Sequence, residues 1–500
     1  MAPHQTPLDP AACYQAVLSR DARFDGHFFT AVRTTGIYCR PVCKVRTPLA
    51  KNCLFFASAA RAEAAGFRPC LRCRPELAPA ALPHWSTQDA SQILAMQAMQ
   101  LLDSAESLAD APLRIADLAA RLGVSERHMR RILAQHLGVT PSQYRQTRRL
   151  LLAKHLLCDT ALPIARIALL SGFASQRRFN TAFAGHYRLT PTACRREGQA
   201  ASDMRLKLAY RPPYDEAAMM RFLAQRAVPG LELCIPTEND TSEFVRILRL
   251  PAGKQTHLGW VRLDFEAEAH RVLVKLSDSL LPVLPTVLQQ VRWALDLDAD
   301  PLAIEATLAR DFAHCAGWRV PGAWEGFELA VRAVLGQQVT VAAARTLTTR
   351  LVHALGEPLA TPWPQLTHAF PAPAALLQAS PDTLGQLGIV RQRQKAIQAL
   401  AQAVLHGGLE LRPGPGVQAT VQALLALPGI GEWTAHYIAM RALRWPDAFP
   451  AGDIVVQQRL GVRDGPHAAR AATARATELA TAWQPWRSYA VIRLWHGGSP

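Results

Sequence analysis

The stretch that decides the fold of the C-terminal part of the chain is LPGIGEWTAHYIAMR, residues 427–441. Gly429 and Gly431 flank a single apolar residue, so the chain can turn tightly between two helices and leave backbone N–H groups to hold a DNA phosphate. A carboxylate, Asp453, follows 22 residues after Gly431 in FPAGDIVVQQRLG. An ordinary turn is the competing interpretation of LPGIG alone, so the prediction of a DNA-binding hairpin rests on the hairpin and the aspartate together.

The sequence on both sides of this hairpin extends the pattern. A helix-hairpin-helix, a Gly/Pro loop and an aspartate at this spacing resemble the helix-hairpin-helix DNA glycosylase superfamily. The closer resemblance is to the 3-methyladenine DNA glycosylase II family, AlkA, over residues 204–497, from KLAYRPPYD at Lys207 through VRAVLGQQVTVAAARTL to WQPWRSYAVIRLW. This resemblance implies excision of alkylated bases, such as 3-methyladenine and 7-methylguanine, by hydrolysis of the N-glycosidic bond.

The same resemblance assigns roles to individual residues. Asp453 is the implied catalytic carboxylate, and the implied base pocket is lined by Phe222, Trp433, Tyr437 and Trp495. From residue type alone, each aromatic could equally pack in the core, and Asp453 could be a helix cap. The chemistry fits the implied roles, because the damaged nucleotide must leave the duplex and a cationic alkylated purine stacks well on aromatic faces. An ionised carboxylate then stabilises an oxocarbenium-like sugar and orients water.

Two absences and two departures refine the expected chemistry. Bifunctional members of the superfamily carry a lysine two residues after the second hairpin glycine, where this chain has Trp433, so we expect a monofunctional enzyme without a Schiff base. No cysteine follows Cys315, so we expect no C-terminal iron–sulfur cluster. The family's intercalating leucine falls on Gln338 and a pocket tyrosine on His496, departures that bear on affinity for damage and on base range.

Four cysteines near the N-terminus form two close pairs, Cys39-x3-Cys43 and Cys70-x2-Cys73, with 26 residues between the pairs. Four soft ligands in two tight turns suit tetrahedral zinc. A set of reduced core cysteines is the alternative, and Cys53, alone in an apolar run, is expected in the core. The spacing therefore predicts one zinc ion bound by the two pairs.

The residues around these pairs, RTTGIYCRPVCKVR from position 33 and GFRPCLRCRPE from position 66, resemble the N-terminal zinc domain of the Ada family of bacterial alkylation-response proteins. The resemblance implies four zinc ligands, of which the first, Cys39, accepts a methyl group from a methylphosphotriester in DNA. A zinc-bound thiolate stays deprotonated and nucleophilic. Methylation would take the site from about −2 to about −1, which should raise affinity for DNA. Thr35, Arg46 and Arg68 match positions near the DNA backbone, with a solvated surface as the alternative.

An internal repeat follows the cysteines. IADLAARLGVS from Ile115 recurs as IARIALLSGFAS from Ile164, and HLGVTPS from His136 recurs as HYRLTPT from His186. In each copy a small residue lets two helices approach, a glycine makes the turn and a serine can cap the second helix. The two copies resemble the AraC-type DNA-binding domain, in which two recognition helices enter successive major grooves. The candidate DNA-contacting arginines on these helices are Arg127, Arg130 and Arg177.

Length, composition and charge set the frame for these motifs. The 500 residues are 49% hydrophobic and carry a net charge of +16, with 26 Lys and Arg against 13 Asp and Glu in residues 1–200 alone. Such a basic half favours a polyanion partner. No basic apolar leader begins the chain, so a cytoplasmic, nucleoid-associated bacterial protein is expected. The guanine-repair tetrapeptide Pro-Cys-His-Arg of the Ada family does not occur, so that activity is not expected.

The predicted architecture is multidomain and mainly α, with a small zinc-bound α/β module and an α+β domain. The expected domains are a zinc module (1–80), a duplicated helix-turn-helix (86–200), an α+β domain (204–300) and a helix-hairpin-helix glycosylase domain (301–500), with a linker at Pro75–Pro83. The predicted function is alkylation repair joined to transcription activation, with double-stranded DNA and RNA polymerase as partners. A regulator with an inactive glycosylase-like module, or a glycosylase tethered to DNA by its N-terminal half, are the alternatives.

Overall fold

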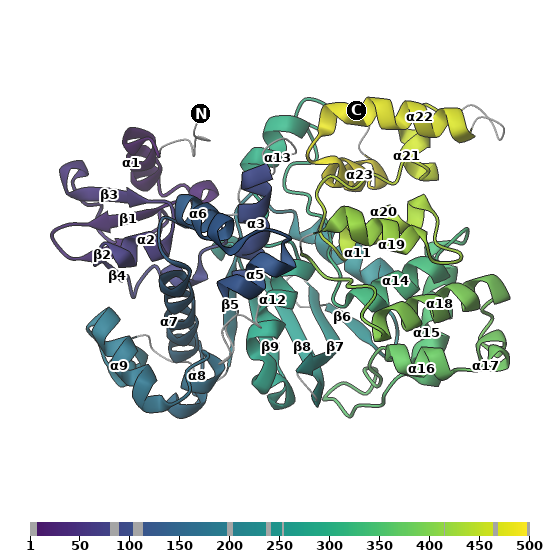
Figure 1. The fold of residues 1–500 in the computed structure, drawn as a ribbon, viewed down its shortest axis with the longest axis horizontal. Helices are drawn as coiled ribbons and strands as arrows, with labels where there is room; N and C mark the ends of the chain where they lie inside the picture. The colour runs from purple at the N-terminus through teal and green to yellow at the C-terminus, as the bar shows by residue number, and fades with distance from the viewer. Residues whose placement is uncertain are drawn as a thin grey trace.

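The computed structural model of the protein describes residues 8–80, 90–103, 114–197, 204–236, 242–252, 255–414, 416–463 and 469–497. A small sheet module and the first helices lie at one end, a five-stranded sheet lies in the middle, and a helical domain fills the other end (Figure 1). Among the described residues, no helix is both long and apolar enough to cross a membrane. This multidomain, mainly helical arrangement with two separate sheets confirms the predicted fold class.

Residues 8–80 form an α/β module around a four-stranded sheet of order β3-β1-β2-β4. Its elements are α1 (Pro10–Ser19), β1 (Phe29–Val32), β2 (Ile37–Cys39), β3 (Cys53–Phe56), α2 (Ala59–Ala64) and β4 (Arg68–Pro69). Strand β4 runs parallel to β2, and the Cys70 N–H donates to the carbonyl of Tyr38 at 2.9 Å. This pairing brings the chain before Cys70 against the end of β2, where Cys39 lies.

The two helix-turn-helix copies share one long helix. The elements are α3 (Ala90–Asp103), α5 (Ile115–Arg121), α6 (Glu126–Leu137), α7 (Pro141–Asp159), α8 (Ile164–Leu170), α9 (Gln176–Tyr187) and α10 (Pro191–Glu197). Gly123 and Gly172 make the turns with positive φ of 65° and 76°, a conformation that favours glycine. Ser125 and Ser175 cap α6 and α9, as predicted, by accepting from backbone N–H groups three residues on.

The middle of the molecule is an antiparallel sheet of order β5-β9-β8-β7-β6. Its elements are β5 (Leu206–Ala209), α11 (Glu216–Arg226), β6 (Glu232–Pro236), β7 (Ser242–Ala252), β8 (Gln255–Glu266), β9 (Arg271–Leu276) and α12 (Leu284–Ala294). The strand-like runs at 231–235, 244–250, 257–265 and 272–275 of the sequence correspond to β6, β7, β8 and β9. The first strand, β5, was not predicted, because its four residues offer too short a pattern.

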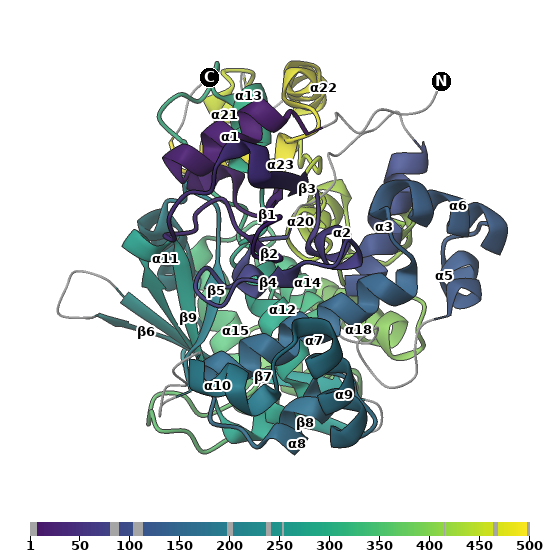
Figure 2. The ribbon, with the colours of Figure 1, turned by 90° about the vertical axis from the view of Figure 1, so that its left-hand side faces the viewer.

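The C-terminal domain is built from helices. They are α13 (Pro301–Leu308), α14 (Gly326–Leu335), α15 (Val341–Leu355), α16 (Pro373–Gln378), α17 (Pro381–Gln386), α18 (Arg391–Leu405), α19 (Val417–Leu425), α20 (Glu432–Arg441), α21 (Ile454–Arg459), α22 (Ala469–Leu479) and α23 (Arg487–Trp495). The predicted hairpin joins α19 to α20, and Gly429 in its turn has φ of 78°. Figure 2 shows helix α20 lying beneath α21, whose N-cap is Asp453, and α23, which carries Trp495.

The apolar cores cross the boundaries expected from the sequence. One buried cluster joins Phe179 and Phe183 of α9 and Leu150 of α7 to Val272 and Val274 of the middle sheet. A second joins the sheet domain to the C-terminal helices. The halves are therefore packed against each other rather than strung on free linkers.

A buried arginine fastens the zinc module to the rest of the chain. Arg211 is fully buried, and its guanidinium donates to the carbonyls of Asp25 (2.7 Å), Ala80 (2.8 Å) and Asp298 (2.9 Å). Gly26 lies so close that an added Cβ would stand 2.1 Å from the Pro79 carbonyl. The described part of the expected Pro75–Pro83 linker is therefore packed, because its carbonyls complete the hydrogen bonding of a buried cation.

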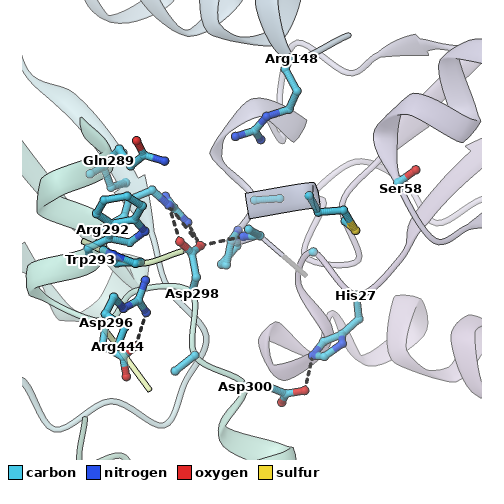
Figure 3. A pocket seen from close by; sticks show the side chains of 18 of the residues that line it. His27, Ser58, Arg148, Gln289, Arg292, Trp293, Asp296, Asp298, Asp300 and Arg444 are labelled. Carbon is cyan, nitrogen blue, oxygen red and sulfur yellow. Dashed lines mark hydrogen bonds and ion pairs between the residues drawn. The ribbon is translucent and has the colours of Figure 1, made fainter. Parts of the chain in front are cut away.

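This contact between the halves encloses a cavity of about 510 Å³. Figure 3 shows charged groups that line it: His27 faces Asp300 across the contact, whereas the Arg292–Asp298 and Arg444–Asp296 pairs lie on one side of it. His27 of the zinc module lies 3.5 Å from Asp300, and Arg292 pairs with Asp298. Charged pairs and apolar side chains therefore both line this cavity between the domains.

Candidate functional site

The four predicted zinc ligands converge. Cys39 ends β2, Cys43 lies in the turn after it, Cys70 follows β4 and Cys73 lies in the next turn. Their Sγ atoms all lie within 4.8 Å of one another, compatible with the ~3.8 Å sulfur separations of a tetrahedral Zn–S₄ centre. The donor set is purely thiolate, which suits zinc, and three of the four cysteines are buried. The residues present therefore fit one Zn²⁺.

The arginines around this cluster divide into two groups. Arg40 is committed to the protein: it pairs with buried Asp25, its Nη1 donates to the Cys73 carbonyl at 3.1 Å, and its N–H donates to the Cys73 Sγ at 3.3 Å. Arg74 pairs with Glu76 and with Asp159 of α7. Arg40 and Arg74 are therefore structural, because they neutralise buried carboxylates.

The residues predicted to contact DNA in this half are exposed or half-buried. Arg46 and Thr35 are exposed and Arg68 is half-buried, and all three lie in the segments that carry the cysteine pairs. On the helix-turn-helix copies, Arg127, Arg130 and Arg177 are exposed near the N-terminal ends of α6 and α9. Arg130 also pairs with Glu126 one turn away. All six side chains are accessible to a polyanion.

In the C-terminal domain, Asp453 is held by three donors. Its carboxylate accepts from the Trp433 indole N–H at 2.8 Å, the Trp495 indole N–H at 3.2 Å and the Val456 backbone N–H at 3.0 Å. The contact with the Val456 N–H makes Asp453 the N-cap of α21. Asp453 is therefore a helix cap, which was the alternative interpretation, and it also lines the cavity. The side chain is 9% exposed and lines the cavity described next. A carboxylate held in place with one face on a cavity can stabilise a positive charge there.

The four predicted pocket aromatics line one cavity of about 390 Å³ together with Asp453. Trp433 and Tyr437 stack with ring centroids 5.2 Å apart and an interplanar angle of 11°, since they lie four residues apart on α20. Trp495 from α23 lies 6.0 Å from Tyr437, and Phe222 of α11 is buried behind them. A cavity of this size and lining accommodates a planar aromatic ligand.

Two arginines that the sequence analysis missed close the far side of this cavity. Arg226 lies 3.8 Å and Arg441 lies 4.8 Å from the Phe222 ring centroid, and Arg441 Nη1 donates to the Tyr437 hydroxyl at 2.7 Å. Burial raises the pKa of Tyr437, but Arg441 and Arg226 outweigh it and hold that pKa below its usual value. Each arginine follows a pocket aromatic of its own helix by four residues, so arginine and aromatic share one helix face. That spacing is the sequence pattern from which the two arginines could have been predicted.

The hairpin and the loop before α15 meet next to this cavity. The Gln337 amide donates to the Gly429 carbonyl at 2.9 Å and to the Thr434 hydroxyl at 3.0 Å. The next residue, Gln338, is exposed with φ of 55°. Gly431 caps α20 at the other end of the turn. The predicted DNA-contacting positions of this domain are thus brought together at one edge of the cavity.

His496 stands behind the pocket rather than in its lining. Its ring lies 6.1 Å from Phe222 and 4.8 Å from Trp318, and Nδ1 is 2.9 Å from the Ile492 carbonyl. Burial lowers the pKa of His496. The departure from tyrosine at this position places an imidazole against the back of the aromatic wall.

Four family models match successive parts of the chain. They describe the metal binding domain of Ada (residues 12–76), a helix-turn-helix domain (118–197), the AlkA N-terminal domain (205–325) and the HhH-GPD superfamily of base excision DNA repair proteins (331–486). The order of these matches agrees with the order of the motifs in the sequence.

Individual relatives match either the whole chain or one half of it. The Escherichia coli DNA-3-methyladenine glycosylase 2 is 35% identical over 58% of this chain and 96% of its own length. The E. coli bifunctional transcriptional activator/DNA repair enzyme Ada is 40% identical over 27% of this chain and 35% of its own length. A Mycobacterium tuberculosis protein named a probable bifunctional transcriptional activator/DNA repair enzyme AlkA is 39% identical over 97% of this chain and 95% of its own length. The chain therefore belongs to the family of bifunctional transcriptional activator/DNA repair enzymes AlkA, in which an Ada-type zinc and helix-turn-helix half precedes a helix-hairpin-helix glycosylase half.

Proposed function

We propose that the C-terminal half excises alkylated bases from double-stranded DNA by a monofunctional, hydrolytic mechanism. The observation that carries this proposal is the carboxylate of Asp453, held by two indole N–H groups at the edge of an aromatic cavity. The flipped base would stack between Trp433, Tyr437 and Trp495, and the sugar would face Asp453. As the C1′–N bond breaks, the carboxylate stabilises the developing cation and orients water toward C1′.

The absence of a lysine at Trp433 supports hydrolysis without strand cleavage. A Schiff base to the sugar needs an amine within reach of C1′, and the cavity lining holds tryptophan, tyrosine and arginine but no lysine among the described residues. Expected products are a free base and an abasic strand that stays intact. Borohydride treatment during turnover should trap no covalent adduct, while base release from methylated duplex proceeds. A trapped adduct would contradict the proposal.

We also propose that the zinc module accepts methyl groups and that this converts the chain into a transcription activator. The Cys39 thiolate would attack the methyl carbon of a phosphotriester, the C–O bond would break, and its electron pair would stay on the phosphate oxygen. One bound Zn²⁺, held by the four cysteines, would keep the thiolates deprotonated. Loss of one negative charge beside Arg46 and Arg68 would then raise DNA affinity.

Metal analysis and methyl transfer test this second proposal. Purified, reduced protein should hold about one zinc per chain and no iron, because one four-thiolate set is visible in the sequence. Labelled methyl from phosphotriester DNA should appear on Cys39, and label on Cys70 or Cys73 would contradict the assignment. RNA polymerase is the proposed partner of the activated chain, and the bacterial cytoplasm, at the nucleoid, its proposed location.

A further inference from the structure

Helix α2 of the zinc module touches the C-terminal ends of both recognition helices. Arg61 Nε donates to the Leu137 carbonyl at 2.8 Å and Nη2 to the His136 carbonyl at 3.2 Å, at the end of α6. Gly138, which ends α6 with φ of 66°, lies so close that an added Cβ would stand 2.3 Å from Arg61 Nε. Arg61 thus caps the first recognition helix with a cation, where the helix dipole favours one.

Two residues on, Glu63 makes the matching contact with the second recognition helix. Its Oε2 lies 2.7 Å from Nε2 of His186, in the last turn of α9, and it accepts from the Thr147 hydroxyl at 2.5 Å. Its Oε1 accepts from the Tyr38 hydroxyl at 2.8 Å. The carboxylate is buried, with every contact directed at a neighbouring element.

The spacing of Arg61 and Glu63 on α2 explains how one short helix contacts both recognition helices. Residues two apart on an α-helix project about 200° apart, so Arg61 and Glu63 leave opposite sides of α2 toward α6 and α9. Their targets are equivalent: His136 and His186 open the two copies of the repeated tail HLGVTPS and HYRLTPT. The zinc module therefore contacts the same position in both copies of the repeat.

We propose that Arg61 and Glu63 are positioning residues that fix the separation of the two recognition helices, and so fix the spacing of the DNA half-sites that the chain binds together. This rests on the proposed function only in that α6 and α9 contact DNA. Long helix α7 alone links the two copies covalently, whereas α2 ties their far ends into one rigid unit. Tyr38 precedes Cys39 in β2, so the unit is anchored in the strand that carries the proposed methyl acceptor.

The test measures how much affinity is lost when the spacing of the half-sites is wrong. A general loss of stability would lower affinity for every spacing alike, whereas the proposal predicts a smaller penalty for wrong spacing. A preferred duplex is first selected from random DNA with the full-length, zinc-loaded protein, and affinities are then measured with one base pair inserted or deleted between the half-sites. Each insertion shifts one half-site by about 3.4 Å and about 35°. Because a hydrogen bond to a charged group is worth about tenfold or more in affinity, Arg61→Met and Glu63→Gln should each lower the penalty for wrong spacing by about tenfold.

Arg23→Met is the matched control. Arg23 is an exposed zinc-module arginine that pairs with Asp21, so the substitution removes the same charge without touching α2. It should lower affinity for both spacings equally. Zinc content and base release report on folding of the two halves. An unchanged spacing penalty in both Arg61→Met and Glu63→Gln would overturn the proposal.

A distance measurement separates this proposal from the proposed DNA binding. Spin labels carried by unnatural amino acids at Ala134 of α6 and Thr181 of α9, both exposed, report the separation of the helices without DNA. Arg61→Met should broaden or shift that distance distribution, and Arg23→Met should not. If the wild-type chain selects no duplex, the proposed DNA binding by α6 and α9 is wrong. An unchanged distance distribution in Arg61→Met would overturn the positioning role whether or not the chain binds DNA.

Discussion

The two candidate reaction sites hold charge in opposite ways. The zinc module gathers four cysteine sulfurs within 4.8 Å of one another, and a bound cation would offset the like charges of their thiolates. The glycosylase site instead holds one carboxylate, Asp453, between neutral donors: two indoles and a backbone amide. In the proposed reactions, the first site would lose one negative charge, whereas the second would keep its charge while a positive charge develops beside it. A single substitution at each site should therefore change the activity of the two sites to different extents.

The largest expected effect comes from Cys39→Ser. Serine cannot supply a thiolate to the metal or to the methyl group, so methyl transfer from phosphotriester DNA should be abolished. Base release should be unchanged, since the chemistry of Asp453 lies in another domain. Cys53→Ser is the control, because Cys53 lies in β3 outside the cluster and should transfer methyl groups normally. Loss of base release in Cys39→Ser would show that the two sites are not independent.

Asp453→Asn should have the next largest effect. The amide keeps the size of the carboxylate but removes the charge that faces the developing cation, and losing such a contact costs ~10²–10³ in rate, about 3–4 kcal/mol. Binding of an abasic duplex should persist, because the proposed phosphate contacts lie at the hairpin around Gly429 and Gly431 rather than at Asp453. Single-turnover base release and a binding titration measure the two quantities separately. Wild-type rates with asparagine would refute the assigned role.

The contrast between the sites also explains what the sequence could predict. Cys39, Cys43, Cys70 and Cys73 lie in two short turns, so their spacing alone indicates a common ligand set. The base pocket draws residues from α11, α20, the N-cap of α21 and α23, and no local spacing connects Phe222 to Trp495. Those residues were assigned through the family resemblance. Arg226 and Arg441 were missed because arginine on a helix surface ordinarily indicates solvent.

The packing between domains was also beyond local sequence patterns. Proline and alanine near residue 80 favour a linker, yet their carbonyls bind the guanidinium of Arg211, which lies more than a hundred residues away. Hydrogen bonds between distant segments depend on the assembled fold rather than on neighbouring residues. The helix-turn-helix repeat, by contrast, was predicted down to its turns and caps, because each copy is decided by residues within one short stretch.

Trp433→Phe sharpens the comparison with a smaller effect. Phenylalanine keeps a ring that can stack on Tyr437 but removes the indole N–H that donates to Asp453 at 2.8 Å. A hydrogen bond to a charged group is worth about 1.5–3 kcal/mol, so base release should slow by about 10- to 100-fold. Trp318→Phe is the control, since its indole donates to Asp215 instead. Equal losses in both variants would indicate general damage to the fold.

The smallest expected effect is a pH dependence at the joint between the zinc module and α9. The hydrogen bond and ion pair with Glu63 raise the pKa of His186 above its usual value. A raised folded-state pKa means that the contact stabilises the folded state fully below the unfolded pKa of about 6.5 and loses that contribution as pH rises through the folded pKa.

The histidine is partly exposed, so screening by solvent keeps this contribution small. Hydrogen exchange of the α9 amides should nevertheless become faster between pH 6 and pH 9 by more than the intrinsic rate predicts. His186→Gln should remove that excess, because glutamine can bond Glu63 but does not titrate. The amides of α20, the helix whose Trp433 contacts Asp453, provide the internal reference for exchange rates away from this joint. If the excess exchange of the α9 amides persists in His186→Gln, another group causes it, and the His186–Glu63 contact does not depend on pH.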